Sequence, residues 1–166
     1  MSEETFGNWI KIMNKTLNYY NENAQSFASG TVSVEFTEMQ DKFLQKLNPR
    51  PYIPDFGCGP GRDTKYSLDQ GYLVEAIDGS EQLCQIASKH TGIKVRQMLF
   101  QELKVNEKYD GIWACASILH LPKKELKEVF KKMLTALKPG GLRINLFPEP
   151  SDIAKIFLVV TADRHA

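Results

Sequence analysis

Two patterns of apolar residues alternate along this chain: short continuous runs, which are typical of strands, and repeats at helical spacing. Short runs with strand character occupy residues 51–56, 72–77, 93–99, 109–115, 142–147 and 153–161. Apolar residues at helical spacing lie between them and predict helices over residues 34–47, 61–70, 80–87 and 122–137. Strands that alternate with helices predict an α/β fold, with a doubly wound, mostly parallel sheet and helices on both faces.

Residues 4–20 also carry apolar side chains near helical spacing. One interpretation is a helix that packs its apolar stripe on the domain. The alternative is a lid that closes over a ligand. The pattern alone leaves both open.

The stretch from Asp55 to Asp63 reads Asp-Phe-Gly-Cys-Gly-Pro-Gly-Arg-Asp and joins the first strand to the next helix. Glycines at such a turn let a backbone approach a ligand closely, and the following helix points its free N–H groups toward it. A dinucleotide site needs G-x-G-x-x-G, but the third glycine position falls on Arg62. An ordinary glycine-rich turn is the remaining alternative.

All four positions of D-x-G-x-G-x-G are present, at Asp55, Gly57, Gly59 and Gly61. The stretch therefore resembles motif I of the class I, Rossmann-like methyltransferases that depend on S-adenosylmethionine (SAM). The resemblance covers about residues 19–147. It implies a helical cap or lid at 1–33 and a SAM-binding domain at 34–166.

Asp78 ends the second predicted strand, about 20 residues after the glycine turn, and Gly79 follows it. A carboxylate at this place can accept both ribose hydroxyls of a nucleoside. The alternative is a turn aspartate before Ser80. Leu99 and Phe100 end the third predicted strand, where the resemblance implies contacts with adenine; they could equally be core residues.

Arg62 resembles an arginine of the tellurite-resistance-like methyltransferases, which act on small molecules. The resemblance implies that its guanidinium meets the methionine carboxylate of SAM, a pairing that suits its fork of donors. The alternative is a surface arginine. Cys58 lies within the loop and can contact the cofactor, although a small packing residue is the preferred interpretation.

The segment from Tyr109 to His120 resembles motif IV of the family. Ala114 is small enough for a cofactor to pass close to its backbone. His120 has the chemistry of a general base near neutral pH, or is a loop histidine held by a hydrogen bond. Tyr19 and Tyr20 resemble a segment that closes over SAM, so Tyr19 is a candidate cofactor contact and Tyr20 a candidate catalytic residue.

The family's usual strand order is 3-2-1-4-5-7-6, but few residues separate the runs 142–147 and 153–161. We therefore expect the order 3-2-1-4-5-7, with strand six missing and the last strand antiparallel. That apolar last run would form an uncovered edge, which predicts a homodimer through it. The competing expectation is that the N-terminal helix, with Trp9 and Ile10, covers this face.

The 166 residues carry a net charge of +1 and suit one globular domain, with no bulk field to attract nucleic acid or a membrane. Three cysteines without metal-type spacing predict reduced thiols, no metal site and a cytoplasmic protein. No signal peptide or membrane-spanning run is expected.

The sequence thus predicts an enzyme that transfers a methyl group from SAM to a small molecule and releases S-adenosylhomocysteine (SAH). The alternative is a non-catalytic SAM-binding or interaction protein derived from the same fold.

Overall fold

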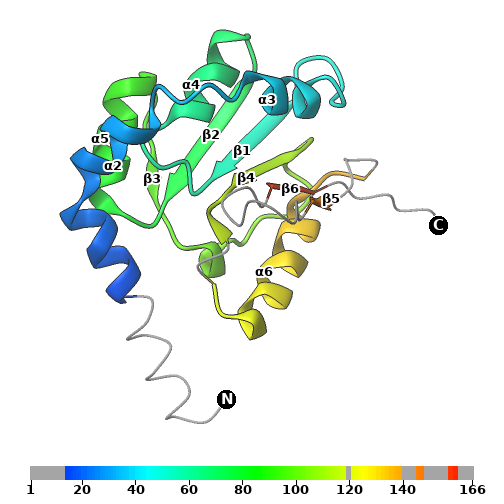
Figure 1. Ribbon diagram of the computed structural model, residues 1–166. Helices are drawn as coiled ribbons and strands as arrows, with labels where there is room; N and C mark the ends of the chain where they lie inside the picture. Colours follow the sequence, from blue (N-terminus) through cyan, green and yellow to red (C-terminus); the bar gives the residue numbers. More distant parts are fainter. Residues whose placement is uncertain (1–13, 119–120, 140–144, 148–156, 161–166) are drawn as a thin grey trace.

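The computed structural model describes residues 14–118, 121–139, 145–147 and 157–160, and it forms one mixed sheet with helices around it (Figure 1). The strands are β1 (Tyr52–Phe56), β2 (Leu73–Asp78), β3 (Arg96–Gln97), β4 (Ile112–Cys115), β5 (Asn145–Phe147) and β6 (Phe157–Val160). The helices are α2 (Ala24–Thr31), α3 (Thr37–Leu44), α4 (Arg62–Asp69), α5 (Glu81–Thr91), α6 (Lys123–Ala136) and the short 3₁₀ turn η1 (Phe100–Glu102). The first four strands are parallel in the order β3-β2-β1-β4, which confirms the predicted fold class.

Apolar side chains cover both faces of this sheet, because successive residues of a strand point to opposite sides. On one face, Phe56 and Ile112 pack with Met133 of α6. On the other, Ile53 and Trp113 pack against α3, and a third cluster lies under α5. The carboxyl ends of β1, β2 and β4 meet at one edge, where the glycine loop begins.

The N-terminal part contains two helical segments rather than the single predicted one. Residues 14–22 are helical, and α2 follows after a turn at Asn23. Figure 1 shows both in blue beside α5. Residues 1–13, which include Trp9 and Ile10, lie outside the described residues, so their expected packing stays a prediction.

The last two strands differ from the predicted order. The full order is β3-β2-β1-β4-β6-β5, so β6 lies between β4 and β5 and is antiparallel to both. The antiparallel direction was predicted correctly, but the pairing of the 142–147 run with the fourth strand was wrong. An inner place gives the apolar run of β6 ladder partners on both sides, whereas the three-residue β5 can occupy the edge.

This order removes the basis of the predicted homodimer through the last run. Residues 157–160 are paired on both sides, and β5 is the outer strand. Residues 153–156 and 161 of the predicted edge lie outside the described residues.

The third strand is also shorter than predicted, because only Arg96 and Gln97 pair with β2.

Candidate functional site

The glycine loop at residues 57–61 joins β1 to α4, and its N–H groups donate to partners within the chain. Those partners are carbonyls for Gly57 (2.8 Å), Cys58 (3.0 Å) and Gly61 (3.0 Å), and the Asp78 carboxylate for Gly59 (2.9 Å). The remaining loop residue, Pro60, has no N–H. The loop therefore differs from phosphate loops, whose N–H groups point at the bound anion.

Two of the loop glycines are required by contacts within the protein itself. Gly57 has φ 71°, and a Cβ on it would lie 2.3 Å from the Cβ of Ser117. Gly61 has φ 90°, and a Cβ on it would lie 2.7 Å from Cγ2 of Thr91. A side chain at either position would therefore strain the backbone and collide with a neighbour. At these two glycines the loop packs closely against the turn after β4 and against α5.

Asp78 lies beside this loop at the carboxyl end of β2. Its two oxygens accept hydrogen bonds from the N–H groups of Gly59 (2.9 Å) and Ser80 (2.8 Å). Burial raises the pKa of Asp78, while the N–H groups of Ser80, Gly59 and Gly79 oppose that rise. The side chain remains partly exposed. A carboxylate offers about four acceptor positions, so Asp78 keeps capacity for hydroxyl donors.

Asp63, in the first turn of α4, is a second carboxylate of the site and is fully partnered. Its Oδ1 accepts from Nε2 of Gln40 (2.7 Å) and Nε of Arg62 (2.6 Å). Its Oδ2 accepts from Nη2 of Arg62 (3.1 Å) and Nε1 of Trp113 (2.8 Å). Four hydrogen bonds fill this buried carboxylate, which joins α3, α4 and β4.

Arg62 is therefore not an ordinary surface arginine. Its guanidinium lies over the Phe36 ring at 4.7 Å, and its Nη2 also reaches Sγ of Cys115 at 3.9 Å. Hydrogen bonding to Asp63 raises its pKa despite the opposing effect of burial. Its Nη1 makes none of the hydrogen bonds described for this side chain.

Asp55 lies beneath the loop, 3% exposed, and accepts a hydrogen bond from Oγ1 of Thr64 at 2.6 Å. Burial, together with the charges of the neighbouring Asp63 and Asp78, raises the pKa of Asp55 to about 8. Three carboxyl groups and one arginine thus share the region of the loop. Asp55 is protonated near neutral pH, and the charges of Asp63 and Arg62 offset each other in an ion pair, so Asp78 is the carboxylate of this group without a cationic partner among the described ion pairs.

The N-terminal segment covers this region from the other side. A Cβ on Gly79 would lie 2.7 Å from Cδ2 of Leu17, and a Cβ on Gly59 would lie 3.5 Å from Cε1 of Phe27. The Tyr20 ring packs edge-on against Phe27, with centroids 5.2 Å apart. Burial raises the pKa of Tyr20, and the Asp78 charge raises it further, so its phenol stays protonated near neutral pH. Tyr20 thus lies near Asp78 and Phe27 with a protonated phenol.

Leu99 lies against Gly79, and Phe100 lies against the glycine loop. A Cβ on Gly79 would lie 3.3 Å from Cδ2 of Leu99, and one on Gly57 would lie 3.2 Å from Cζ of Phe100. Ala114, by contrast, belongs to the core under α6 and is 1% exposed. Its buried side chain therefore packs within the protein.

Two other predicted side chains lie apart from the centre of the site. Tyr19 is 60% exposed. Cys58 packs in the core cluster with Cys84 and Ala87, and burial raises the pKa of its thiol, so the thiol stays protonated. His120 lies outside the described residues, so its role as a base stays a prediction.

Sequence reasoning missed several residues that build the site. Gln40 and Trp113 hold Asp63, and Ser117 donates from its Oγ to the Phe56 carbonyl at 2.6 Å. Ala116, with φ 51°, places Ser117 there. A left-handed alanine costs about 1 kcal/mol or more, and such strain concentrates at functional sites. No local pattern predicted these hydrogen bonds, because the partners of Gln40, Trp113 and Ser117 lie far away in the sequence.

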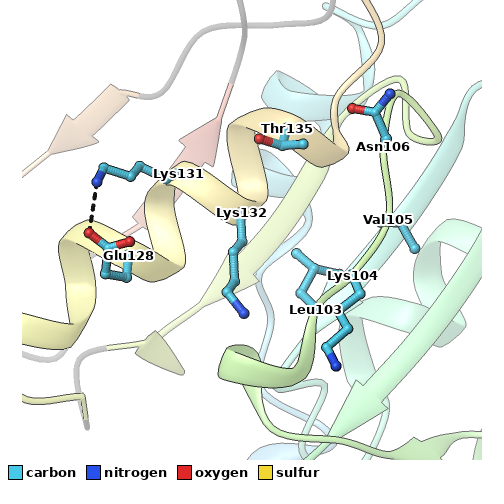
Figure 2. A pocket seen from close by; sticks show the side chains of 8 residues that line it. All are labelled: Leu103, Lys104, Val105, Asn106, Glu128, Lys131, Lys132 and Thr135. Carbon is cyan, nitrogen blue, oxygen red and sulfur yellow. Dashed lines mark hydrogen bonds and ion pairs between the residues drawn. The ribbon is translucent and has the colours of Figure 1, made fainter.

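A groove of about 360 Å³ lies elsewhere, between α6 and residues 103–106 (Figure 2). Figure 2 shows Lys104 and Lys132 on its two walls and the ion pair of Lys131 with Glu128, at 2.8 Å. Lys132 donates to the backbone carbonyl of Gln101. The described lining contains none of the predicted site residues.

Across the described ranges, no group of three or more His, Cys, Asp or Glu side chains is placed to hold a metal ion. Within the same part of the chain, no helix has the length and apolar character needed to cross a membrane.

Comparison with known proteins identifies the family. A protein-family model described as a methyltransferase domain matches residues 53–141, which is more than half of the chain. This range contains the glycine loop, Asp78 and the turn after β4.

Individual proteins agree with this match. The chain is 25% identical over 138 residues to an uncharacterized methyltransferase of Staphylococcus carnosus, covering 83% of this chain and 63% of that protein. It is 21% identical over 143 residues to an 18S rRNA (guanine-N7)-methyltransferase of Schizosaccharomyces pombe, covering 77% of this chain and 53% of the relative. The chain therefore spans less than two thirds of the length of either.

A solved structure extends the similarity of fold over most of the chain. Magnesium protoporphyrin IX methyltransferase from Synechocystis, solved with bound SAM, superposes with a TM-score of 0.69 and 13% identity. The superposition covers 91% of this chain and 97% of that one.

Proposed function

This chain belongs to the family of methyltransferase domains, and from that premise we propose that it binds SAM at the glycine loop and transfers the methyl group to a small molecule. SAM supplies an activated methyl group on a positively charged sulfonium. The residues of this chain bind, orient and shield the reactants, and positioning alone can contribute roughly 7–11 kcal/mol in favourable cases.

The observation that carries the proposal is the pairing of the glycine loop with Asp78. The loop N–H groups are bonded internally, so the loop offers little to a pyrophosphate. Asp78 has spare acceptor positions and is held by two backbone N–H groups, which fits two ribose hydroxyls. The negative charge of Asp78 beside the loop also disfavours a phosphate there. These residues fit SAM better than a dinucleotide.

Other residues take roles around this nucleoside site. Leu99 and Phe100 provide apolar contact for adenine, and Arg62 meets the methionine carboxylate with its Nη1. The N-terminal segment acts as the cap, with Tyr20 donating a hydrogen bond from its phenol. His120 takes the proton of the acceptor. The arginine directly after the loop supports membership in the tellurite-resistance-like group of small-molecule enzymes.

The proposed methyl acceptor is a small molecule, whereas the Schizosaccharomyces pombe relative is named for its action on rRNA. The net charge of +1 supports a small molecule over a polyanion. Thiols and other soft nucleophiles need the least help from a base, so they head the panel of acceptors to test.

Calorimetric titration with SAM and SAH tests the cofactor, with ADP and NAD⁺ as phosphate-bearing controls. We expect SAM and SAH to bind and ADP and NAD⁺ not to bind. Absence of heat with SAM and SAH at millimolar ligand would refute the cofactor assignment. Release of SAH from a panel of thiol, amine and metalloid acceptors then separates an enzyme from a protein that only binds SAM.

A further inference from the structure

Asn21, in the helical segment 14–22, makes a contact to α5 that no sequence pattern predicted. Its Oδ1 accepts a hydrogen bond from Oγ of Ser80 at 2.7 Å and a longer one from the N–H of Gln82 at 3.3 Å. Ser80 is the N-cap of α5, and its Oγ in turn accepts from the N–H of Leu83 at 3.2 Å. One amide oxygen thus joins two segments 59 residues apart at the start of a helix.

This contact lies two residues beyond Asp78, the carboxylate with spare acceptor positions. The same segment places Leu17 against Gly79 and brings Tyr20 close enough for the Asp78 charge to act on it. Because a helical segment is stiff, fixing Asn21 also fixes the residues one position and one turn before it. Asn21 therefore joins the segment that carries Leu17 and Tyr20 to the residues that follow Asp78.

We propose that Asn21 is a positioning residue: it clamps segment 14–22 onto the start of α5 and thereby sets how fast the nucleoside end of a bound ligand leaves the site at Asp78. The second half of this statement rests on the proposed function. The first half concerns the protein alone and is tested without any ligand.

The chain offers well-matched variants for the test. Asn21→Ala removes the acceptor, yet alanine favours helix more than asparagine does, so weaker local helix cannot explain a loss of protection. Asn21→Asp keeps an oxygen acceptor at the start of α5, where negative charge is favourable, and serves as the rescue. Asn23→Ala is the control, because among the hydrogen bonds of the described residues Nδ2 of Asn23 donates to the nearby Tyr19 carbonyl, at 2.8 Å, and not to α5.

Hydrogen exchange of the full chain without ligand tests the clamp. We expect Asn21→Ala to speed amide exchange in residues 14–31 about tenfold, while exchange in β1 and β4 is unchanged. Asn21→Asp restores protection, and Asn23→Ala resembles the parent protein. Parent-like exchange in Asn21→Ala overturns the proposal, and so does equal acceleration in Asn23→Ala.

The dissociation rate of SAH, measured by stopped flow, tests the consequence. We expect about a tenfold faster rate in Asn21→Ala, with an unchanged melting temperature and with recovery in Asn21→Asp. Faster exchange without any SAH binding in the parent would refute the proposed function and leave the clamp intact. SAH binding with an unchanged dissociation rate would overturn the link between clamp and ligand.

Discussion

Two carboxylates flank the glycine loop, and their surroundings differ in one measurable respect. Asp63 accepts four hydrogen bonds, from Gln40, Arg62 and Trp113, and is 8% exposed. Among the described hydrogen bonds, Asp78 accepts two, from the backbone N–H groups of Gly59 and Ser80, and it is partly exposed. The first has filled its acceptor positions, whereas the second has not.

This difference separates a group that holds the fold from a group that can hold a ligand. The partners of Asp63 come from α3, α4 and β4, so losing the carboxylate leaves donors unpaired in three elements. The partners of Asp78 are local backbone groups that fix its direction and leave its outer lone pairs free. Proximity to a glycine loop therefore does not by itself identify a ligand-binding carboxylate; the count of occupied acceptor positions does.

The largest effect is expected for Asp63→Ala. We expect the free energy of unfolding to fall by about 3–5 kcal/mol, because a mostly buried guanidinium and two other donors lose their partner. Urea unfolding measures this. Asp69→Ala in the same helix is the control: its pair with Lys65 is exposed and should contribute no more than about 0.5 kcal/mol. Equal losses in the two variants would show that the Asp63 network is not structural.

Asp78→Ala is expected to act on binding instead. Buried ribose hydroxyls left unpaired should weaken SAH binding by about 1–3 kcal/mol. Unfolding should change far less than in Asp63→Ala. Titration calorimetry and urea unfolding on the same preparation compare the two. If the variant binds SAH with the affinity of the parent protein, Asp78 does not contact the ligand and serves only in the turn after β2.

Arg62→Lys tests whether this arginine contacts the ligand, as proposed for Asp78, or only stabilises the fold, as Asp63 does. Lysine keeps the charge but loses the planar fork, so we expect SAH affinity to fall by about 1–2 kcal/mol. Affinity for 5′-methylthioadenosine, which lacks the methionine carboxylate, should be unchanged. If both ligands weaken equally, Arg62 acts only through Asp63.

Asp55→Asn should give an effect on stability that depends on pH. The folded pKa of about 8 exceeds the ordinary 3.8, so between these values the folded state holds a proton that the unfolded chain has lost. The free energy of unfolding therefore falls as pH rises through that window, by at most about 1.4 kcal/mol per pH unit. Asparagine can still accept from Thr64 but does not titrate, so this contribution disappears.

Urea unfolding of both proteins at pH 5, 6, 7 and 8 measures the difference. We expect the parent to lose stability relative to Asp55→Asn as pH rises. Parallel curves would place the Asp55 carboxylate in its ordinary range and contradict the burial argument.

The sequence by itself determined the parallel part of the sheet, the glycine loop and the place of Asp78. These follow from signals within short stretches: apolar runs that make strands, glycines at a turn, and an acidic residue at a strand end. Parallel strands then bring their carboxyl ends together, so the loop, Asp78 and Leu99 were predicted at one edge without knowing any contact.

Only the tertiary structure decided the place of β6, the partners of Asp63 and the clamp of Asn21 on Ser80. Each depends on residues far apart in the chain, such as Asp63 and Trp113, whose bond spans 50 positions. Side chains such as these have no periodic signature, because their hydrogen bonds satisfy buried donors wherever packing happens to place them. A strand's neighbours likewise depend on which order gives every backbone group a partner, and that is settled only when the whole sheet assembles.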